Sequence, residues 1–249
     1  MKIVLILTYY WPPAGGPGVQ RILKFAKYLP QLGWRPIILT VENGEYPAID
    51  ESLLADVAED MPVYKTSSLE PFSLYRKFTG QKKDDKISTF VLTEDSQGGL
   101  VKRLAAFIRG NLFIPDARIG WKPYAVREGL RIIKEENVQV ILSTAPPMSA
   151  HLIGRALAKK SGLPWIADFR DPWTDVFYYH NLKRTKTAAD IDAWFERMVL
   201  RSASVVTTVS ENIKALLHSK VKNQYRVIAN GFDEDDFDVS PLADDGNLH

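Results

Sequence analysis

The sequence predicts an α/β fold of the Rossmann-like, doubly wound type: a parallel sheet between two layers of helices, three layers in all. Strand and helix signals alternate along the chain, as they do in successive βαβ units. The expected strands are almost continuously apolar, which is typical of parallel strands covered on both faces. Gly33 and Gly162 follow two of the expected helices, where C-terminal glycine caps belong.

Apolar runs and helical periodicity define the individual elements. The expected strands are Ile3–Leu7, Pro36–Val41, Val138–Leu142, Trp165–Ala167, Val205–Val209 and Tyr225–Ala229, with a weaker candidate at Pro62–Lys65. The expected helices are Val19–Leu32, Val101–Arg109, Tyr124–Glu136, Ser149–Lys160, Ile191–Arg201 and Glu211–Leu217. Residues 1–229 are therefore interpreted as one Rossmann-like domain.

Three segments interrupt this alternation. Residues 81–99 are polar, of mixed charge, and end in two glycines, so we expect a mobile excursion there. Residues 177–189 are aromatic and then basic, and they are expected to form a loop beside the site. Residues 230–249 begin with Asn-Gly, which permits a sharp turn, and become acidic. This last segment is either a solvated tail or an interdomain hinge.

Composition excludes several classes of protein. The 249 residues are 45% hydrophobic and 25% charged with a net charge of +2, so no strong field favours nucleic acid. The chain has no cysteine, hence no disulfide, no thiol nucleophile and no cysteine metal site. The N-terminal apolar run covers only Ile3–Leu7, far short of a membrane span. We expect a cytoplasmic protein whose membrane contact, if it has one, is peripheral.

The loop between the first strand and the first helix is rich in glycine and proline. Glycines before a helix free its first N–H groups to bind an anion, and the helix dipole adds positive potential. The loop suits a phosphorylated ligand, although an ordinary strand–helix connection explains it equally well. It departs from the dinucleotide fingerprint because Arg21 stands where the third glycine should be.

Unusual residues follow five of the expected strands. They are Trp11 to Gly18, Thr144 with His151, Asp168 to Trp173, Ser210 with Glu211, and Asn230. Because ligands of open parallel sheets bind outside the carboxyl ends of the strands, these segments are expected to meet along one rim.

The segment Asp168-Phe169-Arg170-Asp171-Pro172-Trp173 is the strongest candidate for chemistry. Arg170 could keep one carboxylate ionised while the other accepts a proton; a structural ion pair with Trp173 as packing is the alternative. His151 could act as a base or contact a phosphate, but a structural histidine is the more common case. The four histidines have no metal-binding spacing, and no serine elbow or phosphate loop is present, so no metal is expected.

Residues 100–133 mix basic with apolar and aromatic side chains. Such a pattern can lie on an anionic membrane surface. Two surface helices with apolar core faces and solvated basic faces produce the same pattern, and that explanation is favoured.

Taken together, the chain resembles the N-terminal half of retaining glycosyltransferases with the GT-B fold, family 4 in particular. The similarity lies in the Met1-Lys2-Ile3 start with the loop Gly15–Arg21, in Asp168–Trp173, in Thr208–Glu211 and in Val227–Asp233. It implies a two-domain enzyme whose N-terminal domain binds the acceptor. Residues 230–249 would then be the hinge and the start of a missing C-terminal donor domain.

The resemblance also implies roles for individual residues. Gly15, Gly16 and Arg21 would position the diphosphate or the acceptor, and Asp168, Arg170 and Asp171 would be the catalytic side chains that orient the acceptor. Thr144, His151, Trp173, Ser210, Glu211 and Asn230 would line the substrate site. Many relatives have a histidine where this chain has Arg170, which leaves the polar role open between Asp168 and Asp171.

The implied reaction needs no cofactor. A UDP- or GDP-sugar would be the donor and a glycan or lipid-linked hydroxyl the acceptor, with the leaving phosphate able to serve as base. Two rival interpretations stay open. One is an NAD(P)-type oxidoreductase domain with Glu42 at the ribose, and the other is a non-catalytic binding module. The sequence does not determine the oligomeric state.

Overall fold

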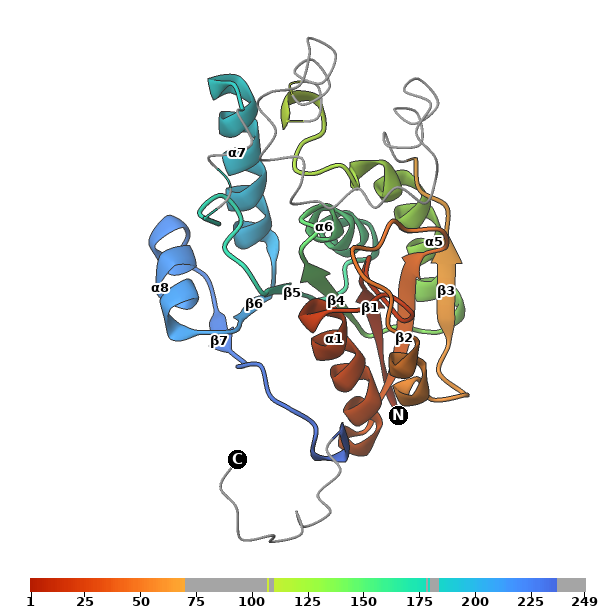
Figure 1. Cartoon of the computed structure of the whole chain (residues 1–249). Coiled ribbons are helices and arrows are strands. Elements are labelled where there is room, and N and C mark those ends of the chain that lie inside the picture. The colour runs from red at the N-terminus through yellow and green to blue at the C-terminus, as the bar shows by residue number, and fades with distance from the viewer. Residues whose placement is uncertain (70–106, 108–109, 178, 180–183, 237–249) are drawn as a thin grey trace, which may run out of the picture.

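A computed structural model describes residues 1–69, 107, 110–177, 179 and 184–236. At its centre is a seven-stranded sheet in the order β3-β2-β1-β4-β5-β6-β7, with every pair parallel (Figure 1). The strands are β1 Lys2–Leu7, β2 Trp34–Val41, β3 Val63–Thr66, β4 Val140–Ala145, β5 Trp165–Phe169, β6 Val205–Thr208 and β7 Tyr225–Val227. The first six strands have the order of the Rossmann fold, which confirms the predicted fold class.

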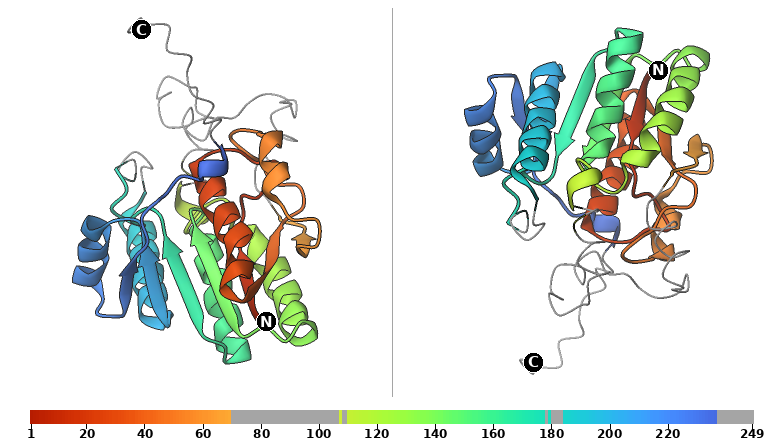
Figure 2. Two further views of the ribbon diagram at one scale, coloured as in Figure 1. Left: turned by 90° about the horizontal axis from the view of Figure 1, so that it is seen from below. Right: turned by 90° about the horizontal axis from the view of Figure 1, so that it is seen from above.

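Helices cover both faces of the sheet, as Figure 2 shows from two sides. The helices are α1 Pro17–Tyr28, α5 Lys122–Glu135, α6 Ser149–Ser161, α7 Lys186–Ser202 and α8 Glu211–Lys220. Helices α5, α6 and α7 lie side by side on one face, and α1 lies on the other. Short 3-10 helices are η1 Leu29–Leu32, η2 Glu51–Asp56, η3 Ile119–Trp121 and η5 Glu234–Asp236.

Two hydrophobic clusters fill the space between these layers. The larger joins the strands to α5, α6 and α7 around Trp121, Trp165 and Phe169, which are all fully buried. The smaller lies under α1, where Ile22 and Leu23 are also fully buried. Alternate strand residues point into opposite clusters, and this is why the sequence reads as continuously apolar rather than alternating.

The termini of the helices follow local sequence signals. Helix α1 begins after Gly16, whose φ of 106° places it in a region that favours glycine. The predicted helix 19–32 is continuous but ends as η1, which has Pro30 near its start and Gly33 in the left-handed conformation behind it. The predicted loop at 177–189 is wrong in its last four residues: the Thr185 side chain accepts from the Ala188 N–H, so α7 starts at Lys186.

Two predicted features lie wholly or mostly outside the described residues. The predicted excursion at 81–99 is one of them. The helix expected at Val101–Arg109 is the other, since only residue 107 of it is described. The predicted strand at 225–229 is shorter than expected, because β7 ends at Val227.

Candidate active site

The candidate site lies between β1 and β4, where the order in which strands are added to the sheet reverses. The chain leaves β1 toward one side of the sheet and leaves β4 toward the other, so the carboxyl ends of these strands flank a crevice of the kind that binds ligands in open α/β sheets. Arg170, directly after β5, reaches across it. Its Nη1 donates to Gly18 O at 2.6 Å and its Nη2 to Pro146 O at 2.6 Å. The loops after β1, β4 and β5 therefore meet on one rim, as expected.

The loop between β1 and α1 is held in place by backbone hydrogen bonds to the segment between β2 and η2. Gly15 N donates to Ala48 O at 3.0 Å, and Asp50 N donates to Pro13 O at 2.8 Å. A Cβ on Gly18 would lie 2.9 Å from the Arg170 guanidinium carbon, so a larger residue there would displace the arginine. The first turn of α1, the positive end of the helix dipole, therefore lies against Arg170 at the rim.

Arg21 and Asp168 form a buried ion pair behind this loop. Arg21 Nη2 lies 2.9 Å from Asp168 Oδ1 and Nε lies 3.2 Å from Oδ2. The two side chains are 3% and 0% exposed. Thr144 and Thr207 donate to the same carboxylate at 2.9 and 2.8 Å. Four donor atoms therefore bond to the Asp168 carboxylate, which is fully buried.

The surroundings of Asp168 keep it ionised. Burial alone would raise the pKa of this carboxyl, but the Arg21 guanidinium, Thr207 and Thr144 hold the pKa below its usual value. Because its oxygens are already used, the carboxylate does not fit the predicted contact with an acceptor hydroxyl. Arg21 and Thr144 are occupied by the same cluster. Asp168, Arg21 and Thr144 therefore bond to one another beneath the rim and support the loops that form it.

Asp171 is placed differently. Its side chain is half-buried beside Arg170, and it makes no hydrogen bond or ion pair with any residue that the structure describes. Arg170 supplies the nearby positive charge, and its own hydrogen bonds go to backbone carbonyls. Of the two carboxylates left open by the sequence, Asp168 is fully paired, and Asp171 is the one without a partner among the described residues.

His151 lies in the core and not at the rim. The ring is 0% exposed and stacks on Phe169 at 4.4 Å between centroids. Its Nδ1 is 2.8 Å from Ser143 Oγ, which accepts from Trp165 Nε1. Burial lowers the pKa of His151 to about 3, only partly opposed by the charge of Asp168. The imidazole is neutral at pH 7 and out of reach of a substrate, which corrects its predicted place in the site.

Four further residues predicted to line the substrate site have structural partners within the chain. Trp173 is 3% exposed and donates its indole N–H to Asp192 at 2.8 Å. Ser210 accepts from the Ile213 N–H as the N-cap of α8, and Glu211 forms an exposed ion pair with Lys214 at 3.0 Å. Asn230 is exposed and accepts from Arg21 at 3.1 Å.

Sequence reasoning missed a polar group on the other side of the crevice. Asp116 accepts from the Ser149 N–H at the start of α6 and from Arg118 N, both at 2.9 Å. The Arg118 guanidinium lies 5.0 Å from the Tyr9 ring centre and donates to Glu45 O. Arg118 belongs to the basic region 100–133, for which solvated basic faces are expected, but it is only 7% exposed. Only the contact between Asp116 and the Arg118 N–H is local; the contacts with Ser149 and Glu45 join distant parts of the chain, which no local signal marks.

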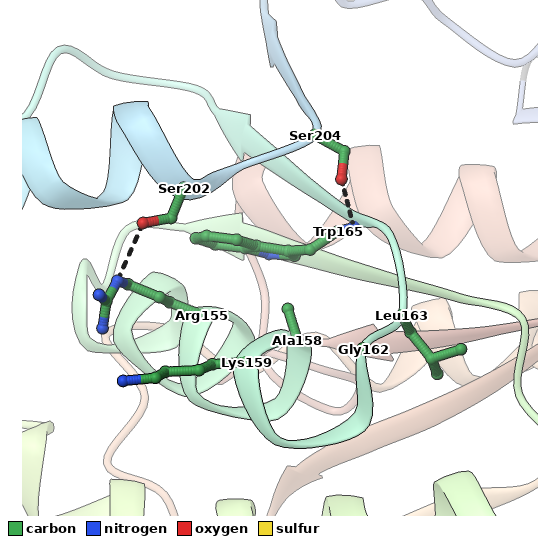
Figure 3. A pocket seen from close by; sticks show the side chains of 8 residues that line it. All are labelled: Arg155, Ala158, Lys159, Gly162, Leu163, Trp165, Ser202 and Ser204. Atoms are coloured by element: carbon green, nitrogen blue, oxygen red, sulfur yellow. Dashed lines mark hydrogen bonds between the residues drawn. The ribbon is translucent and has the colours of Figure 1, made fainter.

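One cavity lies far from this rim. It has a volume of about 260 Å³ and is bordered by Arg155, Lys159, Trp165 and Ser202 (Figure 3). Trp165 is the first residue of β5, so the cavity sits at the amino end of the sheet. No predicted site residue borders it. Separately, no helix in the described part of the chain has the length and apolar character that crossing a membrane requires.

The parallel sheet, its strand order and the loops that meet at the carboxyl ends of β1, β4 and β5 define a Rossmann-like α/β protein. The chain belongs to Glycosyltransferase Family 4, whose model matches residues 16–236. A search of curated proteins found no match.

Solved structures agree in fold. The sucrose-phosphate synthase of Thermosynechococcus elongatus is similar over 93% of this chain and 49% of its own, with 14% identity and a TM-score of 0.55. A glycosyltransferase from Rickettsia africae matches over 98% and 47%, with 16% identity and a TM-score of 0.50. Anabaena HepE, solved with UDP-glucose, matches over 94% and 45%, with 14% identity and a TM-score of 0.50. The chain spans about half the length of these proteins, and the Rossmann-like architecture is that of GT-B glycosyltransferases.

Proposed function

We propose that this chain is the acceptor-binding half of an enzyme that transfers a sugar from a nucleotide-sugar to a hydroxyl acceptor with retention. One observation carries the proposal. Arg170 joins the start of α1 to the loop after β4, and the available carboxylate of Asp171 lies beside it at the switch point. Membership of Glycosyltransferase Family 4 supports sugar transfer as the reaction.

The proposed division of labour follows from this geometry. The first turn of α1, opened by Gly16 and Gly18, would face the donor diphosphate, because N–H groups and the helix dipole stabilise developing phosphate charge. Asp171 would accept a hydrogen bond from the acceptor hydroxyl and fix its direction of attack. The donor would be a UDP- or GDP-sugar; HepE, which has a similar fold, was solved with UDP-glucose. No metal or other cofactor enters this scheme.

The acceptor is proposed to be a glycan or a lipid-linked precursor, handled on the cytoplasmic side with peripheral membrane contact. Support comes from Phe107 and Leu112, which lie in the basic aromatic region and are 51% and 71% exposed. Trp121, from the same region, is fully buried and belongs to the core. Only part of the region is therefore available for such contact.

A turnover assay of the full-length protein against a panel of nucleotide-sugars tests the proposal. Asp171→Asn should lower turnover at least tenfold, about 1.4 kcal/mol in the barrier, and leave the melting temperature unchanged. Asp190→Asn is the matched control, because Asp190 is an exposed aspartate on α7 and its substitution should leave turnover unchanged.

Two results would contradict the proposal. Wild-type turnover in Asp171→Asn would remove this side chain from the mechanism. Micromolar binding of NADH in a calorimetric titration, without sugar transfer, would support the dinucleotide alternative instead.

A further inference from the structure

The chain after β7 turns back to α1. Residues 228–236 cross the carboxyl side of the sheet from its β7 edge and end as η5 beside α1 (Figures 1 and 2). Ile228 N donates to Thr208 O at 2.8 Å and continues the strand pairing. Beyond it, the polar contacts of the segment shift to α1 and η2.

Basic side chains at every third position of α1 form hydrogen bonds and ion pairs with this segment. Arg21 Nη1 donates to Ala229 O at 3.3 Å and to Asn230 Oδ1 at 3.1 Å. One turn further, Lys24 Nζ lies 2.7 Å from Asp233 Oδ2 and 2.6 Å from Asp236 Oδ1. This spacing places the cations on one side of the helix.

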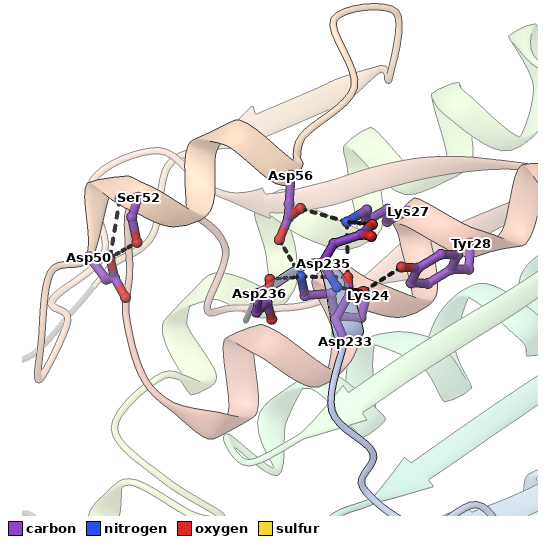
Figure 4. A network of polar contacts seen from close by, with 9 residues as sticks. All are labelled: Lys24, Lys27, Tyr28, Asp50, Ser52, Asp56, Asp233, Asp235 and Asp236. Carbon is purple, nitrogen blue, oxygen red and sulfur yellow. Dashed lines mark hydrogen bonds and ion pairs between the residues drawn. The ribbon is translucent and has the colours of Figure 1, made fainter. Parts of the chain in front are cut away.

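The next turn of α1 extends the same surface. Lys27 Nζ lies 2.9 Å from Asp233 Oδ2 and 3.3 Å from Asp235 Oδ2, and Tyr28 OH donates to Asp233 Oδ1 at 2.6 Å. Figure 4 shows the two ammonium groups among the carboxylates. Asp233 therefore receives three donors from α1.

A carboxylate of η2 completes the cluster. Asp56 lies 2.6 Å from Lys24 and 3.0 Å from Lys27. Asp56, Asp233 and Asp236 are close enough together to suggest a cation site, but the lysine ammonium groups already fill that position. The side chains of Asp233 and Lys24 are only 4% and 16% exposed, so these are not freely solvated surface pairs, which contribute little.

We infer that residues 229–236 form a strap that docks on the basic face of α1 and moves as part of the sheet domain. The sequence had placed the hinge at 230; the contacts attach the chain to the domain as far as Asp236. Through Arg21, which also pairs with Asp168, the strap is connected to the residues behind the candidate site. This inference does not depend on the proposed reaction.

Hydrogen–deuterium exchange on the 249-residue chain tests the strap. Lys24→Gln/Lys27→Gln removes both ammonium groups. Peptides covering 229–236 should then exchange at least tenfold faster, since the Asp235 and Asp236 N–H groups bond within the docked turn. Peptides from β1 and β4 should keep their protection. Lys24→Arg/Lys27→Arg should retain protection of the strap.

The control has the same charge change elsewhere. Lys65→Gln/Lys222→Gln alters two exposed lysines that make no ion pair with the described residues, and it should leave exchange of the strap unchanged. Equal exchange in the Lys24/Lys27 and control variants would overturn the inference. A uniform rise over the whole domain would also overturn it, since that would show general destabilisation instead of release of the strap.

Discussion

Replacing Asp168 by alanine tests whether this carboxylate holds the rim together or serves the reaction directly. The variant leaves the Arg21 guanidinium, 3% exposed, without its counter-charge, and it deprives Thr144 and Thr207 of their acceptor. Breaking a buried ion pair by removing one partner costs about 3–5 kcal/mol. For a chain of this length each kcal/mol corresponds to about 2–4 °C, so the melting temperature should fall by roughly 6–20 °C.

A double-mutant cycle isolates the pair itself. Arg21→Met should be destabilising for the same reason, because Asp168 would then be a buried anion with only hydroxyl donors. In Arg21→Met/Asp168→Ala neither charge remains, so the double variant should be more stable than the sum of the single losses predicts, by at least about 2 kcal/mol.

Urea unfolding followed by circular dichroism measures these free energies, provided that the slope with urea is unchanged among the variants. Asp190→Ala, an exposed carboxylate on α7, should change stability by less than about 0.5 kcal/mol. A loss of less than about 1 kcal/mol in Asp168→Ala, or strict additivity in the cycle, would refute the structural role assigned to the pair.

Two further predictions concern the core behind the site. His151 has a pKa of about 3 when folded and about 6.5 when unfolded, so the unfolded chain binds more protons between these values and stability falls as pH falls from about 6.5 toward 3. Urea unfolding at pH 7, 6 and 5 should show less of this loss in His151→Gln; an identical pH dependence in both proteins would contradict it. A Cβ on Gly154 would lie 2.5 Å from Trp165 Nε1, so Gly154→Ala should lower stability by about 1–3 kcal/mol, and a neutral result would show that the tryptophan can move.

The elements of the fold could be predicted because their signals are local. The apolar run at 3–7, the glycine before α1 and the glycine after α6 each act on neighbours within a few residues. The weak strand at 62–65 was also recognisable, and it forms the edge strand β3. The start of α7 was not predicted, because the polar residues around 185 indicated a loop. The Thr185 side chain caps the helix there and lets it begin at Lys186.

The sequence predicted which strand ends come together, but not the contacts that the residues make there. The strand-end rule brings Asp168–Trp173 to the glycine loop without any knowledge of contacts. It could not assign Arg21 as the partner of Asp168, since 147 residues separate them, and it could not show that His151 and Trp173 face inward. Burial of these two rings depends on how α6 and α7 pack on β5, which no local pattern specifies.

The sequence by itself determined the order of strands and helices, and with it which strand ends lie on one edge of the sheet, because backbone preference and apolar periodicity are set by adjacent residues. Only the tertiary structure decided which charged groups are desolvated together. Arg21 neutralises Asp168 and the lysines of α1 hold Asp233, while Asp171 has no ion pair with the part of the chain that the structure describes. Ionic pairing depends on distance and burial in three dimensions, so which carboxylates are paired and which are not is decided only when the chain is folded.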